Sequence, residues 1–134
     1  MARAYGSRTV ALTVRASLKW VDNLLSQNDV VGVSGGRQGA ARIITHEGLL
    51  AVEITRLLAD VAHIPLARAA TFAGHLVTSG ERPVARIVID PSIALELDVD
   101  AIERRLQGQL LIAVETASRP RRGRPPKRRD LIVE

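Results

Sequence analysis

The sequence predicts a mainly helical α+β domain followed by a disordered basic tail. Apolar residues recur at helical spacing in four segments, which indicates helices with one buried face. Two pairs of β-prone runs are each separated by a turn sequence, a pattern typical of β-hairpins. Residues 119–134 hold seven Lys and Arg and two acids, and a length of 134 residues suits one compact domain with such a tail.

The positive charge of the chain comes entirely from this tail. The chain has 19 Lys and Arg against 14 Asp and Glu, a formal net charge of +5. The tail alone accounts for that charge, with seven cations and two acids, so residues 1–118 are neutral in sum. Within them, residues 1–42 are net +4 and residues 81–118 net −3. We therefore expect the basic end of the body to face phosphate.

The composition excludes several classes of protein. The chain has no Cys, which rules out a disulfide framework, a Cys-based zinc site and thiol catalysis. Aromatic residues make up only 2% of the chain, so base stacking on single strands is a weaker expectation than duplex binding. No apolar run approaches 18 residues and no signal peptide is visible, so we expect a cytoplasmic, nucleoid-associated protein.

The first elements are an ambiguous segment and an amphipathic helix. Residues 8–16 fit a short helix or a strand, because several of them are β-branched. Ser17 is a suitable N-cap for a helix over residues 18–27. The apolar face of that helix holds Trp20, Val21, Leu24 and Leu25, and the polar face holds Lys19, Asp22, Asn23 and Ser26. The polar face suits a helix that reads a DNA groove, or an ordinary solvated face.

A glycine-rich hairpin is expected next, over residues 30–44. Two β-prone runs flank a tip in which Arg37 and Gln38 lie between glycines, with Arg42 just behind. A nucleotide phosphate is a poor fit, because the P-loop Lys-Ser/Thr and the dinucleotide fingerprint spacing are missing. A helix followed by a hairpin with a basic tip is the order of a winged helix-turn-helix, in which the wing contacts the DNA backbone.

Two helices follow. Thr45 is a suitable N-cap for a helix that continues to about residue 62, and residues 63–65 interrupt it. Pro65 favours the first position of another helix over residues 66–77. Residues 9–77 resemble the MerR-like winged-helix class in the order of these parts, and residues 39–50 look like its wing strand and following helix. The resemblance implies that Arg42 contacts the DNA backbone, and that helices after the winged domain form a homodimer.

The last part of the body is a hairpin and a helix. After a linker at residues 78–83, β-prone runs at 84–89 and 93–97 flank an Asp-Pro-Ser turn. Asp98 or Asp100 would cap a helix over residues 101–117. Its apolar stripe is Ile102, Leu106, Leu110, Ala113 and Ala117, widened by Leu111 and Val114. Such a small unit cannot bury its apolar faces alone. We expect it to dimerise, although it could instead complete the core of a monomer.

Residues 120–129 of the tail contain Arg122-Gly123-Arg124-Pro125, which resembles an AT-hook. A narrow A·T minor groove attracts inserted Arg, and a glycine between two Arg lets the backbone approach the groove floor. The resemblance implies that Arg122 and Arg124 enter the groove. The expected phosphate contacts are Arg119, Arg121, Lys127, Arg128 and Arg129. A solubilising or RNA-binding tail is the alternative.

Catalytic and metal sites are not expected. His46, His63 and His75 are 17 and 12 residues apart, which is not the spacing of helical metal ligands. The acidic cluster Asp98, Asp100 and Glu103 is explained by helix capping. Ser17 and Ser34 have no nearby base, so we expect neither an enzyme nor a cofactor.

The expected function is sequence-specific binding of duplex DNA by a transcriptional regulator. Residues 1–78 would form the DNA-binding domain, residues 84–118 the dimerisation segment and residues 119–134 the A·T-preferring hook. The expected DNA contacts are Arg15, Ser17, Lys19, Asn23, Ser26, Arg37, Gln38, Arg42, Arg121, Arg122, Gly123, Arg124, Pro125, Lys127 and Arg128. Two alternatives stay open, each with only the hook on DNA: an antitoxin-like or partner-docking module, and a nucleoid architectural protein.

Overall fold

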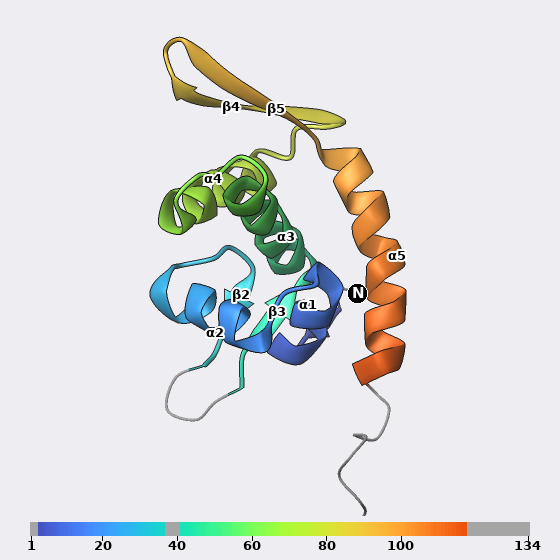
Figure 1. Cartoon of the computed structure of the whole chain (residues 1–134). Helices are drawn as coiled ribbons and strands as arrows, with labels where there is room; N and C mark the ends of the chain where they lie inside the picture. Colours follow the sequence, from blue (N-terminus) through green and yellow to red (C-terminus); the bar gives the residue numbers. More distant parts are fainter. Residues whose placement is uncertain (1–2, 37–40, 118–134) are drawn as a thin grey trace, which may run out of the picture.

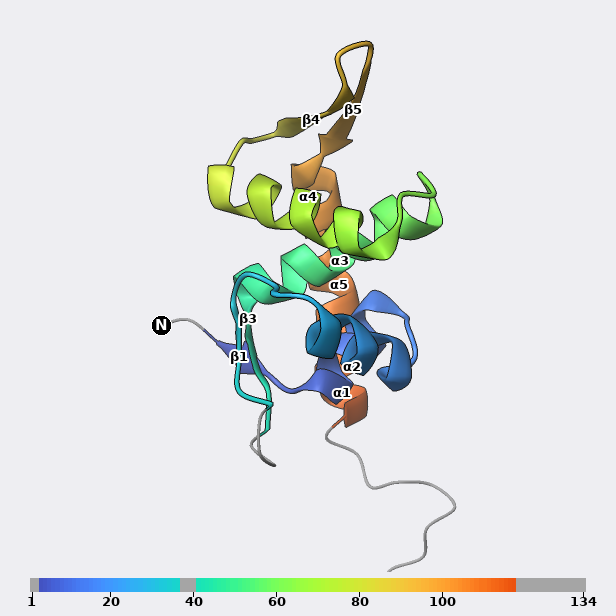
Figure 2. The same ribbon diagram turned by 90° about the vertical axis from the view of Figure 1, so that its left-hand side faces the viewer.

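The computed structural model describes residues 3–36 and 41–117 and shows a mixed α+β fold (Figure 1). The described elements are β1 (Ala4–Tyr5), α1 (Ser7–Val14), α2 (Leu18–Gln27), β2 (Val33–Ser34), β3 (Ile43–Thr45), α3 (His46–Asp60), α4 (Leu66–Ser79), β4 (Val84–Asp90), β5 (Ile93–Asp98) and α5 (Val99–Ala117). The β4–β5 ribbon lies at one end of the molecule, α1, α2 and the β2–β3 hairpin lie at the other, and α5 runs along the side (Figures 1 and 2).

The first helix pair agrees with the sequence and settles its ambiguity. Most of the segment 8–16 is helical, with α1 over Ser7–Val14 and Arg15 and Ala16 outside it. Val10 and Val14 are fully buried in the core, and this packing outweighs the weak helix propensity of β-branched residues. The predicted helix over residues 18–27 is confirmed as α2. Its cap is confirmed too, since the Ser17 side chain accepts a hydrogen bond from the Trp20 amide at 3.0 Å.

The hairpin predicted over residues 30–44 is present but shorter. β2 pairs antiparallel with β3, with Val33 opposite Ile44, and β1 joins the other edge of β3, a pairing that the sequence did not predict. The first strand begins only at Val33, because Gly32 just before it has φ of +79° and turns the chain. A Cβ on Gly32 would lie 2.4 Å from Thr45 Oγ1 and 2.5 Å from the Gly48 amide nitrogen. Only glycine therefore fits this close approach to the start of α3.

The two central helices are present, but α3 ends at Asp60, two residues early, and α4 continues to Ser79, two residues into the predicted linker. The Thr45 hydroxyl accepts a hydrogen bond from the Gly48 amide at 3.2 Å and caps α3. Most of the first three turns of α3 are buried, and α4 packs across this helix. Pro65 is the N-cap of α4 and not its first helical residue, which is Leu66. No helix in the described part of the chain is long and apolar enough to cross a membrane.

The β4–β5 ribbon turns one face towards the helices. Ala85 pairs with Leu97 and Ile87 with Leu95, and both β4 residues are buried against the body. α5 begins at residue 99, two residues before the predicted start, and Asp98 caps it by accepting from the Ala101 amide at 2.9 Å.

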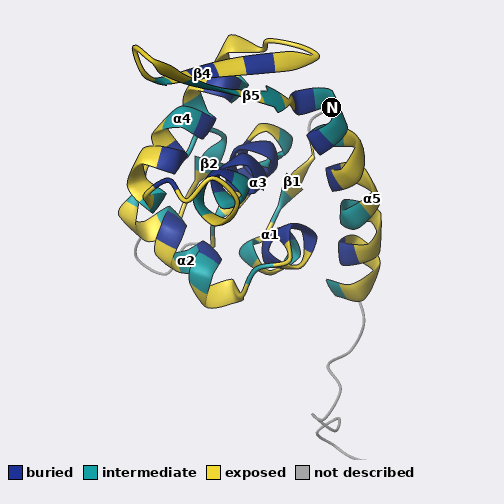
Figure 3. Cartoon of the chain, turned by 45° about the horizontal axis from the view of Figure 1, so that its top comes forward, coloured by how far each residue is buried: buried dark blue, intermediate teal, exposed yellow. Residues whose placement is uncertain are grey.

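α5 packs against α1 of the same chain (Figure 3). Ile102 and Leu106 join the cluster of buried residues that includes Val10 and Leu49, so residues 84–117 contribute to one shared core. The predicted widening of the apolar stripe is wrong. Leu111 is 75% exposed and Val114 is also exposed, because α1 covers only one side of α5.

Candidate nucleic-acid interface

The exposed face of α2 carries a compact group of polar side chains. Val21 and Leu24 are fully buried and fix the rotation of the helix about its axis. This rotation leaves Lys19, Asn23 and Ser26 exposed, which confirms the predicted division of the helix into two faces. The exposed groups are an ammonium, an amide and a hydroxyl, which together can donate and accept hydrogen bonds.

Arg42 joins this helix to the β2–β3 hairpin. Its Nη1 donates a hydrogen bond to Asp22 Oδ1 on α2 at 2.8 Å, and its side chain is only 19% exposed. The backbone of Gly36 covers the same side chain, since a Cβ on Gly36 would lie 2.8 Å from Arg42 Cγ. The structure therefore places Arg42 between α2 and the base of the hairpin, rather than free on the surface.

A groove of about 680 Å³ lies between the C-terminal end of α2 and the base of the hairpin. Its lining residues are Leu25, Ser26, Gln27, Asn28, Asp29, Val30, Val33, Ser34, Gly35, Gly36 and Arg42. Ser26 belongs both to this groove and to the exposed face of α2, so the two form one continuous polar surface. The polar surface therefore extends from α2 to the base of the hairpin.

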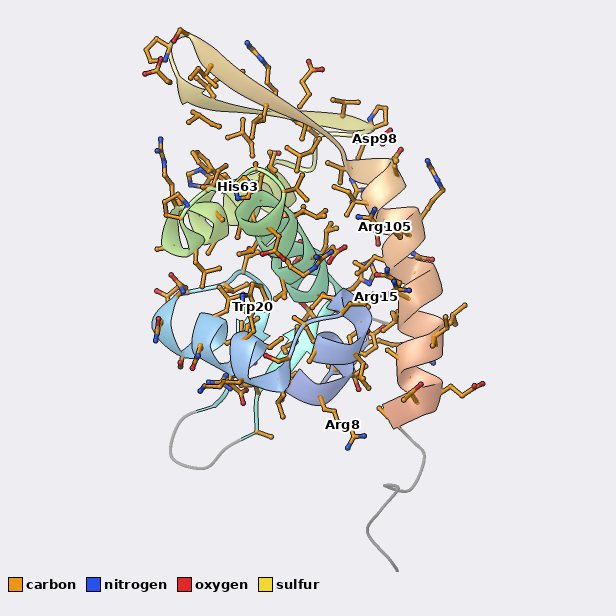
Figure 4. The ribbon with its side chains drawn as sticks, viewed as in Figure 1. Arg8, Arg15, Trp20, His63, Asp98 and Arg105 are labelled. Atoms are coloured by element: carbon orange, nitrogen blue, oxygen red, sulfur yellow. The ribbon has the colours of Figure 1, made fainter. Side chains whose placement is uncertain are left out.

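Arg15 lies apart from this surface. It ends α1 in the left-handed conformation, with φ of 60°, and it is exposed beside α5 (Figure 4). There it lines a small hollow of about 90 Å³ together with Gln109, Ile112 and Thr116 of α5. The structure thus groups Lys19, Asn23 and Ser26 with the hairpin, and places Arg15 next to the C-terminal helix.

The C-terminal end of α5 and the free ends of β2 and β3 lie at the same end of the molecule (Figures 1 and 2). Exposed Arg8 lies at that end as well (Figure 4). The remaining predicted contacts lie outside the described residues: Arg37, Gln38, Arg119, Arg121, Arg122, Gly123, Arg124, Pro125, Lys127, Arg128 and Arg129.

The acidic cluster near the start of α5 makes ion pairs that sequence reasoning missed. Asp98 is the cap and Asp100 lies in the first turn of α5, as the sequence predicts, whereas Glu103 lies beyond the first turn. Arg82 donates to Asp100 and to Glu103, each at 3.1 Å, and Glu103 also pairs with His46 at the start of α3. Burial raises the pKa of Glu103, but the hydrogen bonds from His46 and Arg82 outweigh it, and the pKa lies below its ordinary value.

A second missed group ties α5 to α3 through a buried charge. The Glu53 side chain is fully buried, and its carboxylate accepts from Arg56 Nε at 3.1 Å and from Arg105 Nη2 at 3.5 Å. Glu53 and Arg105 are 52 residues apart. A glutamate in a helix carries no local signal for such a distant partner. Both ion-pair groups hold the elements in place and lie away from the polar face of α2.

Metal and family comparisons give no further site. Among residues 3–36 and 41–117, no group of three or more His, Asp or Glu side chains could hold a metal ion. No protein-family model matches the chain, and no curated protein matches it in sequence. A function for the chain must therefore be inferred from its own residues and their geometry.

Proposed function

We propose that the protein is a sequence-specific duplex-DNA-binding transcriptional regulator built on a winged helix-turn-helix. The observation that carries this proposal is the juxtaposition of the exposed polar face of α2 with the β2–β3 hairpin. A reading helix needs such a polar face, fixed by a buried opposite face, and a hairpin beside it that can contact the DNA backbone.

The connection between the first two helices supports this architecture. α1 ends at Val14 and α2 begins at Leu18, so three residues join them, as in helix-turn-helix units. An α-helix with its side chains is about 10–12 Å wide and fits a major groove about 12 Å wide. In this position α2 presents Asn23 to an adenine edge, a bidentate contact, and Lys19 to guanine or phosphate. The Ser26 hydroxyl would donate a hydrogen bond to a base edge or accept one from it.

The tail supports the proposal because its Arg-Gly-Arg sequence lies only a few residues after the end of α5. Four residues lie between the end of α5 and Arg122, so Arg122 is five Cα-to-Cα steps away, a reach of at most about 18 Å when fully extended. An A·T minor-groove contact by Arg122 and Arg124 would therefore fall within about one helical turn of the body. Two modest contacts on one duplex reinforce each other through effective concentration.

The proposal includes a homodimer, because a two-fold protein matches a palindromic site. The buried stripe of α5 is already covered by α1 of the same chain. A second copy would therefore contact the exposed side of α5, where Leu111 and Ile112 are 75% and 66% exposed.

The same two residues favour a second candidate, a partner-docking module in which only the hook binds DNA. Exposed large apolar residues close together in sequence are typical of protein–protein contacts. The two candidates differ in what the body does without its tail.

Titration of a 1–117 chain against duplex DNA distinguishes them. The regulator proposal expects residues 1–117 to shift duplex DNA, more weakly than the full chain. A truncated chain with native circular dichroism that binds no duplex would overturn it in favour of the docking module. A footprint separates discrete half-sites, which the regulator requires, from the continuous coverage expected of an architectural protein.

A further inference from the structure

We propose that Asp22 is a positioning residue, which fixes the angle of the wing to the reading helix by holding Arg42. Arg42 then acts as a strut, meaning that it connects α2 to the hairpin through its bond to Asp22 and does not bind a DNA phosphate. The inference rests on the proposed function, because its consequence is the quality of DNA recognition.

The first observation is the bond across the two elements. Asp22 lies on α2, Arg42 directly precedes β3, and 20 residues separate them in sequence. Nη1 of Arg42 donates to Oδ1 of Asp22 at 2.8 Å, the distance of a charge-assisted hydrogen bond. The side chain of Arg42 is 19% exposed and that of Asp22 45% exposed, so water screens the pair only in part.

The second observation is the backbone that closes over Arg42 from the other side. Gly36 has φ of +87°, and a Cβ there would lie 2.9 Å from Arg42 Nε. Gly35 has φ of +83°, and its Cβ would lie 2.4 Å from the carbonyl oxygen of Ala41. Arg42 therefore lies between the α2 carboxylate and the glycine backbone of the hairpin. A change in the angle of the hairpin to α2 would disturb the Arg42–Asp22 bond.

The charges favour a strut over a phosphate contact. If Arg42 left Asp22 for a phosphate, the Asp22 carboxylate would remain unpaired on the face that meets the DNA. A like charge at such a contact opposes binding. The two roles consequently predict opposite signs for Asp22→Asn. Removal of a competitor for Arg42 would tighten binding, whereas removal of an anchor weakens it.

The test uses the full chain with Asp22→Asn, Arg42→Gln and the double variant. Asp29→Asn is the matched control, because Asp29 is an exposed acid that lines the same groove and loses the same charge. Affinity is measured for a selected duplex and for a random duplex, over a range of salt concentrations. We expect Asp22→Asn and Arg42→Gln each to lower the specific-to-random affinity ratio about tenfold. The double variant should have the same specific-to-random affinity ratio as each single variant, because both substitutions remove one interaction.

The salt slope separates a strut from a ligand. A lost phosphate contact reduces the slope of log affinity against log salt by about 0.9. We expect Arg42→Gln to leave the slope unchanged. A slope reduced by about 0.9, or an Asp22→Asn variant that binds the selected duplex more tightly than Asp29→Asn does, would overturn the inference.

Amide hydrogen exchange tests the role of Asp22 in the absence of DNA. In Asp22→Asn the amides of β2 and β3 should exchange faster, while those in the middle of α3 stay protected. If Arg42→Gln fails to fold, Arg42→Lys keeps the charge but loses the planar donor geometry and should show the same loss of specificity. A full unaltered chain that binds no duplex would overturn the proposed function itself. Normal binding with an unaffected Asp22→Asn would overturn only this inference.

Discussion

The attachment of α5 to the body predicts a large difference between two identical substitutions on one helix. Leu106 is fully buried where α5 packs on α1, and Leu111 is 75% exposed. Leu106→Ala removes three carbons, worth about 2.4 kcal/mol at about 0.8 kcal/mol per buried carbon. The cavity left behind adds to this, so we expect a loss of about 3 kcal/mol in the free energy of unfolding. At a protein concentration too low for a dimer to form, Leu111→Ala should change it by less than about 0.5 kcal/mol.

Urea unfolding followed by circular dichroism measures both variants. With a slope of about 1.5 kcal/mol per molar urea, Leu106→Ala should lower the midpoint by about 2 M. The measurement is repeated at two protein concentrations, because a core completed by a second copy would make the midpoint depend on concentration. Equal losses in the two variants would refute the reasoning that α1 of the same chain covers the buried face of α5.

Three further predictions concern other parts of the molecule. Gly32→Ala should cost about 2 kcal/mol in thermal unfolding, because the new Cβ would strike Thr45 Oγ1 and disturb the cap of α3; Gly74→Ala, where a Cβ meets nothing within 4 Å, is the control. Glu103→Gln should destabilise the chain above the ordinary carboxyl pKa of 4.5, with a difference that vanishes as pH falls through the lowered folded-state pKa; a difference independent of pH would contradict the ion-pair role. Deletion of residues 118–134 should weaken duplex binding and reduce its salt slope by about 0.9 per lost phosphate contact; an unchanged slope would remove the tail from the interface.

The local signals in the sequence were sufficient for most of the helices. Ser17 and Thr45 were identified as N-caps because a capping hydroxyl acts on amides only three residues away. The apolar spacing of α2 likewise predicted its buried face, since one helix contains the whole pattern. β1 has two residues and carries no such pattern, so its pairing with β3 could not be predicted.

The parts that the sequence did not reveal depend on long-range packing. His46, which pairs with Glu103, is 57 residues away in sequence. The local sequence therefore predicts only helix capping for the acidic cluster around Glu103. Proximity in sequence predicts that Arg15 and Lys19 share a surface, but α5 packs beside Arg15. Leu111 and Val114 widened the predicted stripe, and only the position of α1 shows that they stay exposed.

Recognition of a DNA sequence by the exposed face of α2 is the central proposal, and selection from a randomised duplex pool tests it most directly. The full chain and a Lys19→Ala/Asn23→Ala variant are each used to enrich bound duplexes. Asp60→Ala, an exposed substitution at the end of α3, serves as the control variant. We expect the unaltered chain and the control to enrich one defined motif, and the double variant to lose preference at two or more of its positions. Enrichment of the same motif by all three chains would contradict the proposal that α2 reads the DNA.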